Sequence, residues 1–348
     1  MPHSHSAAPA GAGAIASATP YPELNDVLVQ LVEGAREALG ESFVGAYLQG
    51  SFALGDFDEA SDVDALIVVA EDIAPDRLPA LQTLHAHLFA LPSPWAQRLE
   101  LAYAPAAILR HKDGQPRDPP GEPRTDDWAD PATSGLPPAA YPFWFLGNGT
   151  SALVRSEHDN SQVVRWVTRE AGVALAGPPA AELIDPVAPE ALKAEVREVL
   201  ATVLHLVLDE NLALDQAWLA AFFVTFACRA LHSLETGRVT SKKAASAWAA
   251  HALGERWAGL IQRALESRLA PQPARDAAPH PAEVEATVAF LRAVRQRAVI
   301  ERQLALKKAA HGVGGNGRAS GPRPGGAIGG KPSRGPAPIR PGGRGRRG

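Results

Sequence analysis

Residues 50–69, which read GSFALGDFDEASDVDALIVV, decide the fold of this chain. Before them, residues 43–49 are rich in β-branched and aromatic side chains and predict a strand, and the apolar run after the Asp-Val-Asp triplet predicts a second strand. The segment between the two strands is then a hairpin-like turn. Successive side chains of a strand point to opposite faces, so Asp62 and Asp64 share a face while the residue between them enters the core.

Two neighbouring carboxylates repel each other unless a cation lies between them. Hard carboxylate oxygens suit Mg²⁺, which commonly takes one or two carboxylates together with substrate phosphates. Gly50 and Ser51 supply the phosphate side, because Gly lets the backbone approach a phosphate and a Ser hydroxyl with adjacent amides can hydrogen-bond its oxygens. An Asp-x-Asp pair alone is more often a solvated strand end. The order of strand, Gly-Ser, loop and Asp-Val-Asp resembles the nucleotidyltransferase superfamily that contains DNA polymerase β, and this resemblance implies nucleotidyl transfer.

A third carboxylate is expected on a nearby strand. Residues 98–104 alternate polar and apolar side chains as a half-buried strand does, and residues 76–90 predict a helix before them. The resulting β-α-β order places Glu100 beside the aspartate pair. A carboxylate there could bind metal or accept the proton of a substrate hydroxyl. The alternative is a surface Glu on the wet face of a strand.

The composition predicts a soluble globular protein. With 348 residues, 46% hydrophobic and 21% charged, the chain can bury a large core and form two domains with tails. The single Cys228 excludes an internal disulfide, and its apolar helix favours a buried structural thiol in a reducing cytoplasm. Residues 1–20 lack the pattern of a signal peptide, and the longest apolar run is about half of a bilayer-spanning length, so we expect no membrane span.

We predict the fold class α+β: a polymerase β-like nucleotidyltransferase domain with a mixed sheet and helices, followed by an all-helical domain. The C-terminal tail carries eight Lys and Arg residues and no acidic residue, so a net charge of −4 leaves −12 for the rest of the chain. Such a tail permits weak contact with nucleic acid, but a solvated low-complexity tail without a specific role is the more typical interpretation. The predicted parts are a disordered tail (1–20), the nucleotidyltransferase domain (21–155) with a Pro-rich loop (111–142) that is either a disordered insertion or a lid, the helical domain (156–310) and a disordered basic tail (311–348).

The second half of the chain changes to helical periodicity. Gly177 and Gly237 are helix stops, and Ser241 is a good N-cap residue. Lys242 and its neighbour Lys243 then lie in the first turn of a helix, where they oppose the macrodipole and call for an anion. The predicted helices cover residues 162–176, 190–208, 215–235, 242–253 and 282–309.

A triphosphate at the helix that begins with Lys242 would collect amide donors, the helix dipole and the lysine charge. Arg229 lies in an otherwise apolar helix and also needs an anionic partner. The alternatives are solvated surface lysines and a structural ion pair between Arg229 and a Glu of the helical domain.

A closer resemblance covers roughly residues 21–268 outside the long loop. Residues 228–231 (Cys-Arg-Ala-Leu), 236–238 (Thr-Gly-Arg) and 241–242 (Ser-Lys) resemble the C-terminal domain of aminoglycoside nucleotidyltransferases, which adenylylate streptomycin and spectinomycin. The resemblance implies a drug site between the two domains, where ATP also binds. It implies that Asp62 and Asp64 hold Mg²⁺, that Glu100 is the general base, and that Arg229 and Lys242 hold the ATP phosphates.

The expected drug contacts depart from the family. Asp215 stands where the family has an Asp, but Glu210 stands where it has a Trp, and Trp218 is close in sequence without matching that place. This departure favours another aminocyclitol or a different hydroxylated compound over streptomycin. In the segment 156–160 (Ser-Glu-His-Asp-Asn), Asp159 or its neighbour Asn160 is expected to cap the following helix, and a role of Glu157, His158 or Asp159 in the substrate cleft is the alternative.

The predicted function is Mg²⁺-dependent transfer of AMP from ATP to a hydroxyl of a small molecule, with release of pyrophosphate. The acidic body suits a cationic aminoglycoside or aminocyclitol antibiotic as acceptor, and thus a role in antibiotic resistance. We expect a cytoplasmic monomer. The alternatives are adenylylation of a protein target and a non-catalytic protein that binds nucleotide or nucleic acid.

Overall fold

A computed structural model of the protein describes residue 15 and residues 17–110, 141–210, 212–267 and 269–313. Most of the predicted N-terminal tail, nearly all of the Pro-rich loop and most of the basic tail lie outside the described residues. The sheet and the helical region of the second half belong to one compact unit that ends at residue 303.

The first region is built on a mixed sheet of six strands in the order β5-β4-β3-β2-β1-β6. Strands β2 and β3 are parallel, and all other neighbours are antiparallel. The predicted hairpin-like β1–β2 connection and the β-α-β unit that follows it are both present. The strands are β1 (Phe43–Leu48), β2 (Val63–Val69), β3 (Leu99–Pro105), β4 (Phe143–Leu146), β5 (Leu153–Ser156) and β6 (Val173–Ala176).

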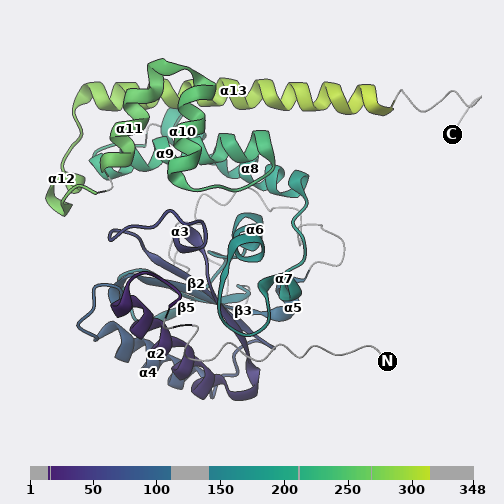
Figure 1. Ribbon diagram of the computed structural model, residues 1–348. Helices are drawn as coiled ribbons and strands as arrows, with labels where there is room; N and C mark the ends of the chain where they lie inside the picture. The colour runs from purple at the N-terminus through teal and green to yellow at the C-terminus, as the bar shows by residue number, and fades with distance from the viewer. Residues whose placement is uncertain (1–14, 16, 111–140, 211, 268, 314–348) are drawn as a thin grey trace, which may run out of the picture. The chain divides into compact units, whose positions relative to one another are not determined.

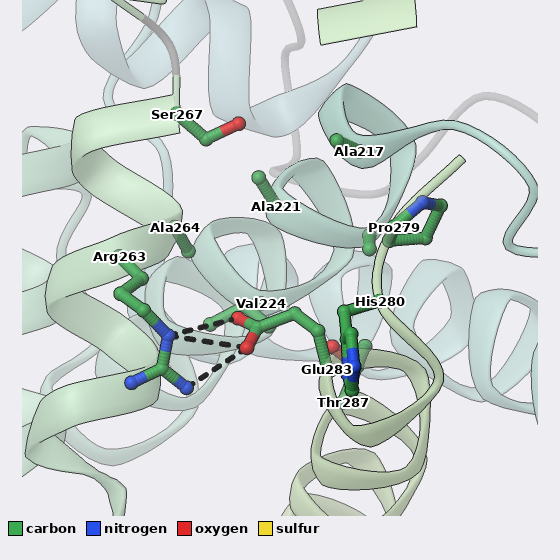
Figure 2. A pocket seen from close by; sticks show the side chains of 11 residues that line it. Ala217, Ala221, Val224, Arg263, Ala264, Ser267, Pro279, His280, Glu283 and Thr287 are labelled. Atoms are coloured by element: carbon green, nitrogen blue, oxygen red, sulfur yellow. Dashed lines mark hydrogen bonds and ion pairs between the residues drawn. The ribbon is translucent and has the colours of Figure 1, made fainter. Parts of the chain in front are cut away.

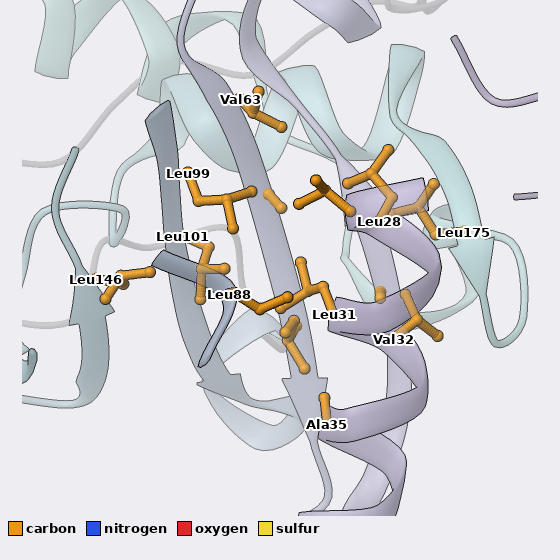
Figure 3. Close-up of a cluster of buried hydrophobic side chains, with 14 of the residues drawn as sticks. Leu28, Leu31, Val32, Ala35, Val63, Leu88, Leu99, Leu101, Leu146 and Leu175 are labelled. Atoms are coloured by element: carbon orange, nitrogen blue, oxygen red, sulfur yellow. The ribbon is translucent and has the colours of Figure 1, made fainter. Parts of the chain in front are cut away.

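Helices α2 (Pro22–Leu39) and α4 (Leu78–Phe89) lie side by side against one face of the sheet (Figure 1). Leu28 and Leu31 of α2 have no exposed surface and point toward strand residues such as Leu101 (Figure 3). Burial of one such side chain contributes about 1.5–3 kcal/mol, so this face is the main core of the first region. The short helices α5 (Ala106–Leu109) and α7 (Ala180–Leu183) contribute to a second apolar cluster with residues of the same strands.

The helix predicted over residues 162–176 is wrong in its second half. Helix α6 (Gln162–Ala171) ends where the Gly172 amide donates to the Thr168 carbonyl. A Cβ on residue 172 would lie 2.3 Å from that carbonyl oxygen, so the turn requires a Gly. The residues after it form β6, which pairs with β1 at the sheet edge. The apolar run 173–176 therefore completes the sheet of the first region.

The second region is helical, as predicted, around one apolar cluster. Its central helix, α9 (Ala217–Thr236), contacts α8, α10, α11 and α12. Helix α9 is long and apolar enough to cross a membrane by length and composition, but 61% of that stretch is buried inside the fold, which accounts for its apolar character. The other helices are α8 (Pro189–Leu208), α10 (Lys242–Leu253), α11 (Ala258–Ser267), α12 (Gln272–Asp276) and α13 (Pro281–Val313).

The short helical turns of the chain are α3 (Gly50–Ala53) after β1, and the 3₁₀ turns η1 (Gly40–Ser42), η2 (Ala96–Arg98) and η4 (Glu255–Trp257). Two residues of the loop after β1, Ala53 and Leu54, pack against the apolar cluster of the helical region. The segment that carries the aspartate pair thus also touches the helices.

Candidate active site

Three carboxylates meet at the start of the central strands. Asp64 of β2 and Glu100 of β3 are opposite each other in the parallel register, as the β-α-β order predicts. Asp62 lies just before β2, and its Oδ1 accepts a hydrogen bond of 2.5 Å from Nδ2 of Asn148. The sheet therefore brings together the three acidic residues that the sequence pattern selected, and Asn148 joins them from the turn between β4 and β5.

This cluster holds more negative charge than its surroundings neutralise. Burial, followed by the charges of Glu100, Asp159 and Asp62, raises the pKa of Asp64 to about 7, while Lys242 acts in the opposite direction. A carboxyl group with such a pKa is held partly protonated near neutral pH. A bound cation would remove this penalty, which makes the cluster a fitting place for a divalent metal.

Gly50 is required by the position of Asp64. Its φ is +57°, and a Cβ on residue 50 would lie 1.8 Å from Oδ2 of Asp64. The Gln49 amide donates to the Asp64 carbonyl at 2.9 Å, which fixes the end of β1 against the start of β2. Ser51 follows, half-buried, in the first turn of α3. Of the Gly-Ser pair predicted to face a phosphate, Gly50 therefore lies directly against Asp64 of the carboxylate cluster.

Glu100 is held by a histidine that the sequence named only as one alternative. Nε2 of His158 lies 3.1 Å from Oε1 of Glu100, and its ring packs on Phe145 with the centroids 4.4 Å apart. The hydrogen bond to Glu100, together with the negative charge of Asp159, raises the pKa of His158 against the opposing effect of burial. The contact fixes the orientation of the Glu100 carboxylate.

The neighbouring Asp159 is buried and does not cap a helix. The N-cap of α6 is Ser161, whose Oγ accepts from the Val164 amide at 3.1 Å, so the cap expected at residue 159 or 160 is wrong. Oδ2 of Asp159 accepts a bond of 3.1 Å from Gln49, and burial raises the pKa of Asp159 to about 6. Its charge adds to that felt by Asp64. Asp159 thus belongs to the carboxylate cluster.

Arg229, in the middle of α9, interacts electrostatically with carboxylates of the first region. Burial lowers its pKa, and the negative charges of Asp64 and Asp56 oppose that shift. The alternative of a structural ion pair with a Glu does not hold within the described part of the chain, where Arg229 makes no hydrogen bond or ion pair with a carboxylate. The Arg229 guanidinium therefore lies in the negative field of these carboxylates.

Helix α10 differs from the prediction at its first turn. Ser241 caps it as expected, but the Lys243 amide donates to Oδ2 of Asp56 at 2.9 Å, and Nζ of Lys243 lies 3.0 Å from Oδ1 of the same carboxylate. The anion for Lys243 is therefore Asp56, 187 residues away in the chain. The amide of Lys243 is not open to a phosphate, whereas the charge of Lys242 still acts on Asp64.

Asp56 is a residue that the sequence reasoning did not select. It is 8% exposed, and although burial would raise its pKa, hydrogen bonds from Lys243 and Ser241 lower the pKa below its ordinary value. The sequence signal for Asp56 was the pair of lysines in the first turn of a helix, which predicts a nearby anion. The signal does not distinguish a bound ligand from a carboxylate of the chain itself.

The residues predicted to contact the acceptor lie before α9. Asp215 is exposed and forms no ion pair with a described residue, whereas Oε1 of Glu210 lies 3.1 Å from Nε2 of His205. A cavity of about 250 Å³ lies between α9, α11 and the start of α13 (Figure 2). Its lining includes Ala217 and Ala221 but none of the predicted site residues, and its main polar feature is the ion pair of Arg263 with Glu283.

Comparisons with known proteins agree with this geometry. Residues 31–91 match the family described as nucleotidyltransferase domain, so the chain is a nucleotidyltransferase. Residues 184–293 match the family described as aminoglycoside adenylyltransferase, C-terminal domain. The two matches, in this order along the chain, support an aminoglycoside nucleotidyltransferase.

A solved structure shares the fold over most of the chain. It is the spectinomycin adenyltransferase AAD(9) from Enterococcus faecialis, crystallised with ATP and spectinomycin, with a TM-score of 0.54 and 13% sequence identity. The match covers 78% of this chain and 98% of that one. No curated protein sequence matches this chain.

Proposed function

We propose that this protein transfers AMP from ATP to a hydroxyl group of an aminoglycoside or aminocyclitol and releases pyrophosphate. One observation carries the proposal: carboxylates of the sheet, Asp64 above all, and cations of the helical region, Arg229 and Lys242, act on one another at one place. Phosphoryl chemistry needs both charges, since a metal requires anionic ligands and a phosphate requires cationic ones.

The donor set fits Mg²⁺. Asp62 and Asp64 offer the one or two carboxylates that Mg²⁺ uses together with phosphate and water. Among the described residues, no group of three or more His, Cys, Asp or Glu side chains is placed to hold a metal ion, so the proposal relies on two carboxylates together with oxygens of the nucleotide. When bound, Mg²⁺ would neutralise phosphate charge and polarise the reacting oxygens.

Glu100 is proposed as the general base. It lies in register with Asp64, so it would face a hydroxyl placed at the α-phosphorus, and it would accept the proton as the new ester bond forms. His158 would keep the carboxylate turned toward that hydroxyl through the 3.1 Å contact. The bond between the α-phosphorus and the bridging oxygen breaks on the opposite side, and the electrons leave with pyrophosphate.

Arg229 and Lys242 are proposed to bind the phosphates that depart. A guanidinium can bond two phosphate oxygens at once, and an ammonium adds a point charge. Gly50 and Ser51 would approach the phosphates from the other side with backbone and hydroxyl donors. The contacts of the two cations and of the Gly50 and Ser51 donors with the phosphates would become stronger as negative charge accumulates on the departing pyrophosphate. Stronger contacts in the transition state would lower the barrier to transfer.

The acceptor is proposed to be a small cationic molecule. Asp159, Asp215 and Glu210 are proposed to bind the amines of the acceptor, because carboxylates attract cations. The spectinomycin and ATP bound in AAD(9), whose fold this chain shares, support an acceptor of this kind. We further propose that the protein acts as a cytoplasmic monomer.

The test is the release of pyrophosphate from MgATP with streptomycin, spectinomycin, kanamycin or no acceptor, combined with mass spectrometry of the acceptor. The proposal expects release that depends on an acceptor, an acceptor mass increased by AMP, and loss of both with Glu100→Ala. Release without acceptor accompanied by AMP on a protein would instead establish protein adenylylation. No release with any acceptor would refute small-molecule transfer.

A further inference from the structure

Asn148 is a polar residue beside the carboxylate cluster to which the proposed reaction gives no role. It lies in the turn between β4 and β5, and Nδ2 of its side-chain amide donates to Oδ1 of Asp62 at 2.5 Å. Only the NH₂ end of the amide can make this bond, because an ionised carboxylate offers acceptors alone. The contact is therefore a charge-assisted hydrogen bond from an uncharged side chain.

The two aspartates of the pair are held in different ways. Asp64 is part of β2, where its carbonyl accepts from the Gln49 amide at 2.9 Å and its side chain lies against Gly50. Asp62 is exposed and precedes the first residue of β2. A carboxylate in such a place can adopt several rotamers, and a metal that binds it must supply the free energy of ordering it. The bond from Asn148 orders this side chain before a metal arrives.

The turn that carries Asn148 is itself fixed to helix α4. Gln82 of α4 bonds the end of the turn with both ends of its side-chain amide. Its Nε2 donates to the Ser151 carbonyl at 2.5 Å, and its Oε1 accepts from the Leu153 amide at 3.1 Å. The end of the turn is thus held to α4 by two hydrogen bonds.

A second glutamine holds the turn directly next to Asn148. The Gly149 amide donates to the Gln97 carbonyl at 3.0 Å. Nε2 of Gln97 donates in turn to the carbonyls of Phe89 and Leu91, at 2.7 and 2.9 Å, at the C-terminal end of α4. Because the turn is connected to the same helix at two places, the amide of Asn148 reaches the carboxylate cluster from a fixed position.

An uncharged donor orients a carboxylate without neutralising it. A Lys or Arg at position 148 would form an ion pair with Asp62 and would compete with a cation for the same charge. The amide of Asn148 leaves the negative charge in place, and its bond takes one of the roughly four lone-pair sites of a carboxylate. Carboxylates that bind metals are commonly held by an outer hydrogen bond of this kind.

We propose that Asn148 is a positioning residue of the metal site: its amide holds Asp62 in the orientation that binds Mg²⁺ and thereby sets the affinity for the metal. The inference rests on the proposed function only where that function assigns Mg²⁺ to Asp62 and Asp64. Asn148 itself does not touch the metal. Loss of its amide therefore weakens metal binding but leaves the fold, and the chemistry at saturating metal, largely intact.

The test is the Mg²⁺ dependence of the melting temperature. It is measured without nucleotide and with an ATP analogue whose α,β-bridging oxygen is replaced by a methylene group, so that no transfer occurs. Loss of an outer hydrogen bond to a metal ligand typically lowers metal affinity about 10–100-fold. Because Asn148 is exposed, we expect Asn148→Ala to raise the Mg²⁺ concentration at half of the effect about tenfold, at the low end of that range. Asn148→Lys should raise it further, because the ammonium group pairs with Asp62 and repels the cation.

Steady-state kinetics separates a positioning role from a structural one. In Asn148→Ala, half-saturation of pyrophosphate release should need about ten times more Mg²⁺, while kcat at saturating Mg²⁺ changes less than about twofold. Ser151→Ala is the matched control, because it truncates a side chain of the same turn and keeps the carbonyl that binds Gln82. In EDTA, the melting temperatures of both Ala variants should stay close to that of the wild type.

A raised Mg²⁺ midpoint in Asn148→Ala supports the inference even if the wild type releases no pyrophosphate, in which case only the proposed function fails. Four results would each overturn it: an unchanged midpoint in Asn148→Ala, an equal rise in Ser151→Ala, an affinity of Asn148→Lys for Mg²⁺ equal to that of the wild type, or no effect of Mg²⁺ on the wild type in either condition.

Discussion

Replacement of Asp56 by Asn tests whether the contact between the loop after β1 and helix α10 holds Lys242 in place. The carboxylate is 8% exposed and binds both the amide and the ammonium group of Lys243, at 2.9 and 3.0 Å. Asn keeps an acceptor for the amide but removes the charge. Since Lys242 precedes Lys243 in the same helical turn, a looser turn would displace the ammonium that acts on Asp64.

The size of the effect expected for Asp56→Asn follows from the interactions that the Asp56 carboxylate makes. The Lys243 side chain is 61% exposed, so the ion pair itself contributes only about 0.2–1 kcal/mol. Removal of a negative charge from a helix N-terminus costs about another 0.3–1 kcal/mol. We therefore expect Asp56→Asn to lower the free energy of unfolding by about 1–2 kcal/mol and kcat by about tenfold, the effect of 1.4 kcal/mol on the barrier.

The assays are urea unfolding and steady-state kinetics at saturating MgATP. Glu59→Gln is the matched control, because it removes one exposed negative charge from the same loop. A kcat for Asp56→Asn equal to that of the control would refute the positioning role, even if stability falls.

The sign of the pH dependence follows from the lowered pKa of Asp56. A carboxyl whose pKa is lower in the folded state stabilises the fold above its unfolded pKa of about 3.9, and this contribution disappears as the pH falls through the folded pKa. The stability difference between wild type and Asp56→Asn should thus be constant from pH 5 to 8 and vanish in strong acid. A difference that persists there would show that the loss does not come from the charge.

The other predictions concern the carboxylate cluster. Asp64→Asn removes a buried charge, so it should stabilise the metal-free protein at pH 8 and abolish the rise of the melting temperature with Mg²⁺; an equal Mg²⁺ effect in the variant would contradict the assigned metal site. Glu100→Gln should lower kcat about 10²–10⁴-fold with little change in the KM for ATP, as measured by pyrophosphate release, and a smaller loss would exclude a general base. Gly50→Ala would place a methyl group 1.8 Å from Oδ2 of Asp64. It should lower the free energy of unfolding in urea by about 1–3 kcal/mol and remove most of the activity. Unchanged stability and activity would mean that the loop can shift to accommodate the methyl group.

The sequence was sufficient where one local pattern sets both the fold and the positions of the charged side chains. The strand periodicity around residue 64 predicted which face Asp62 and Asp64 share, and the helix before residue 98 predicted the parallel strand that brings Glu100 beside them. Arg229 was identifiable because a guanidinium in an apolar helix requires an anionic environment. These inferences need only the period of a strand or helix and the cost of an unpartnered charge.

The sequence was insufficient where the structure of a segment, or the partner of a side chain, depends on residues far away in the chain. The short apolar run 173–176 fits a helix as well as a strand, and only its pairing with β1 makes it the edge strand β6. The contact of Asp56 with Lys243 joins residues 187 positions apart. His158 reaches Glu100 because β5 and the turn after it return to the sheet, which no local periodicity encodes.

Asp56 and Asp64 show how the same side chain acquires opposite properties in one site. Asp56 meets a helix N-terminus, a hydroxyl and an ammonium group, and its pKa is lowered. Asp64 is half-buried among other carboxylates with less compensation from Lys242, and its pKa is raised to about 7. The chain therefore neutralises the carboxylate that joins loop and helix and leaves the carboxylate cluster around Asp64 with excess negative charge. We infer that this excess is what recruits a metal with its nucleotide, because neutralisation by the protein's own cations would remove the reason for either to bind.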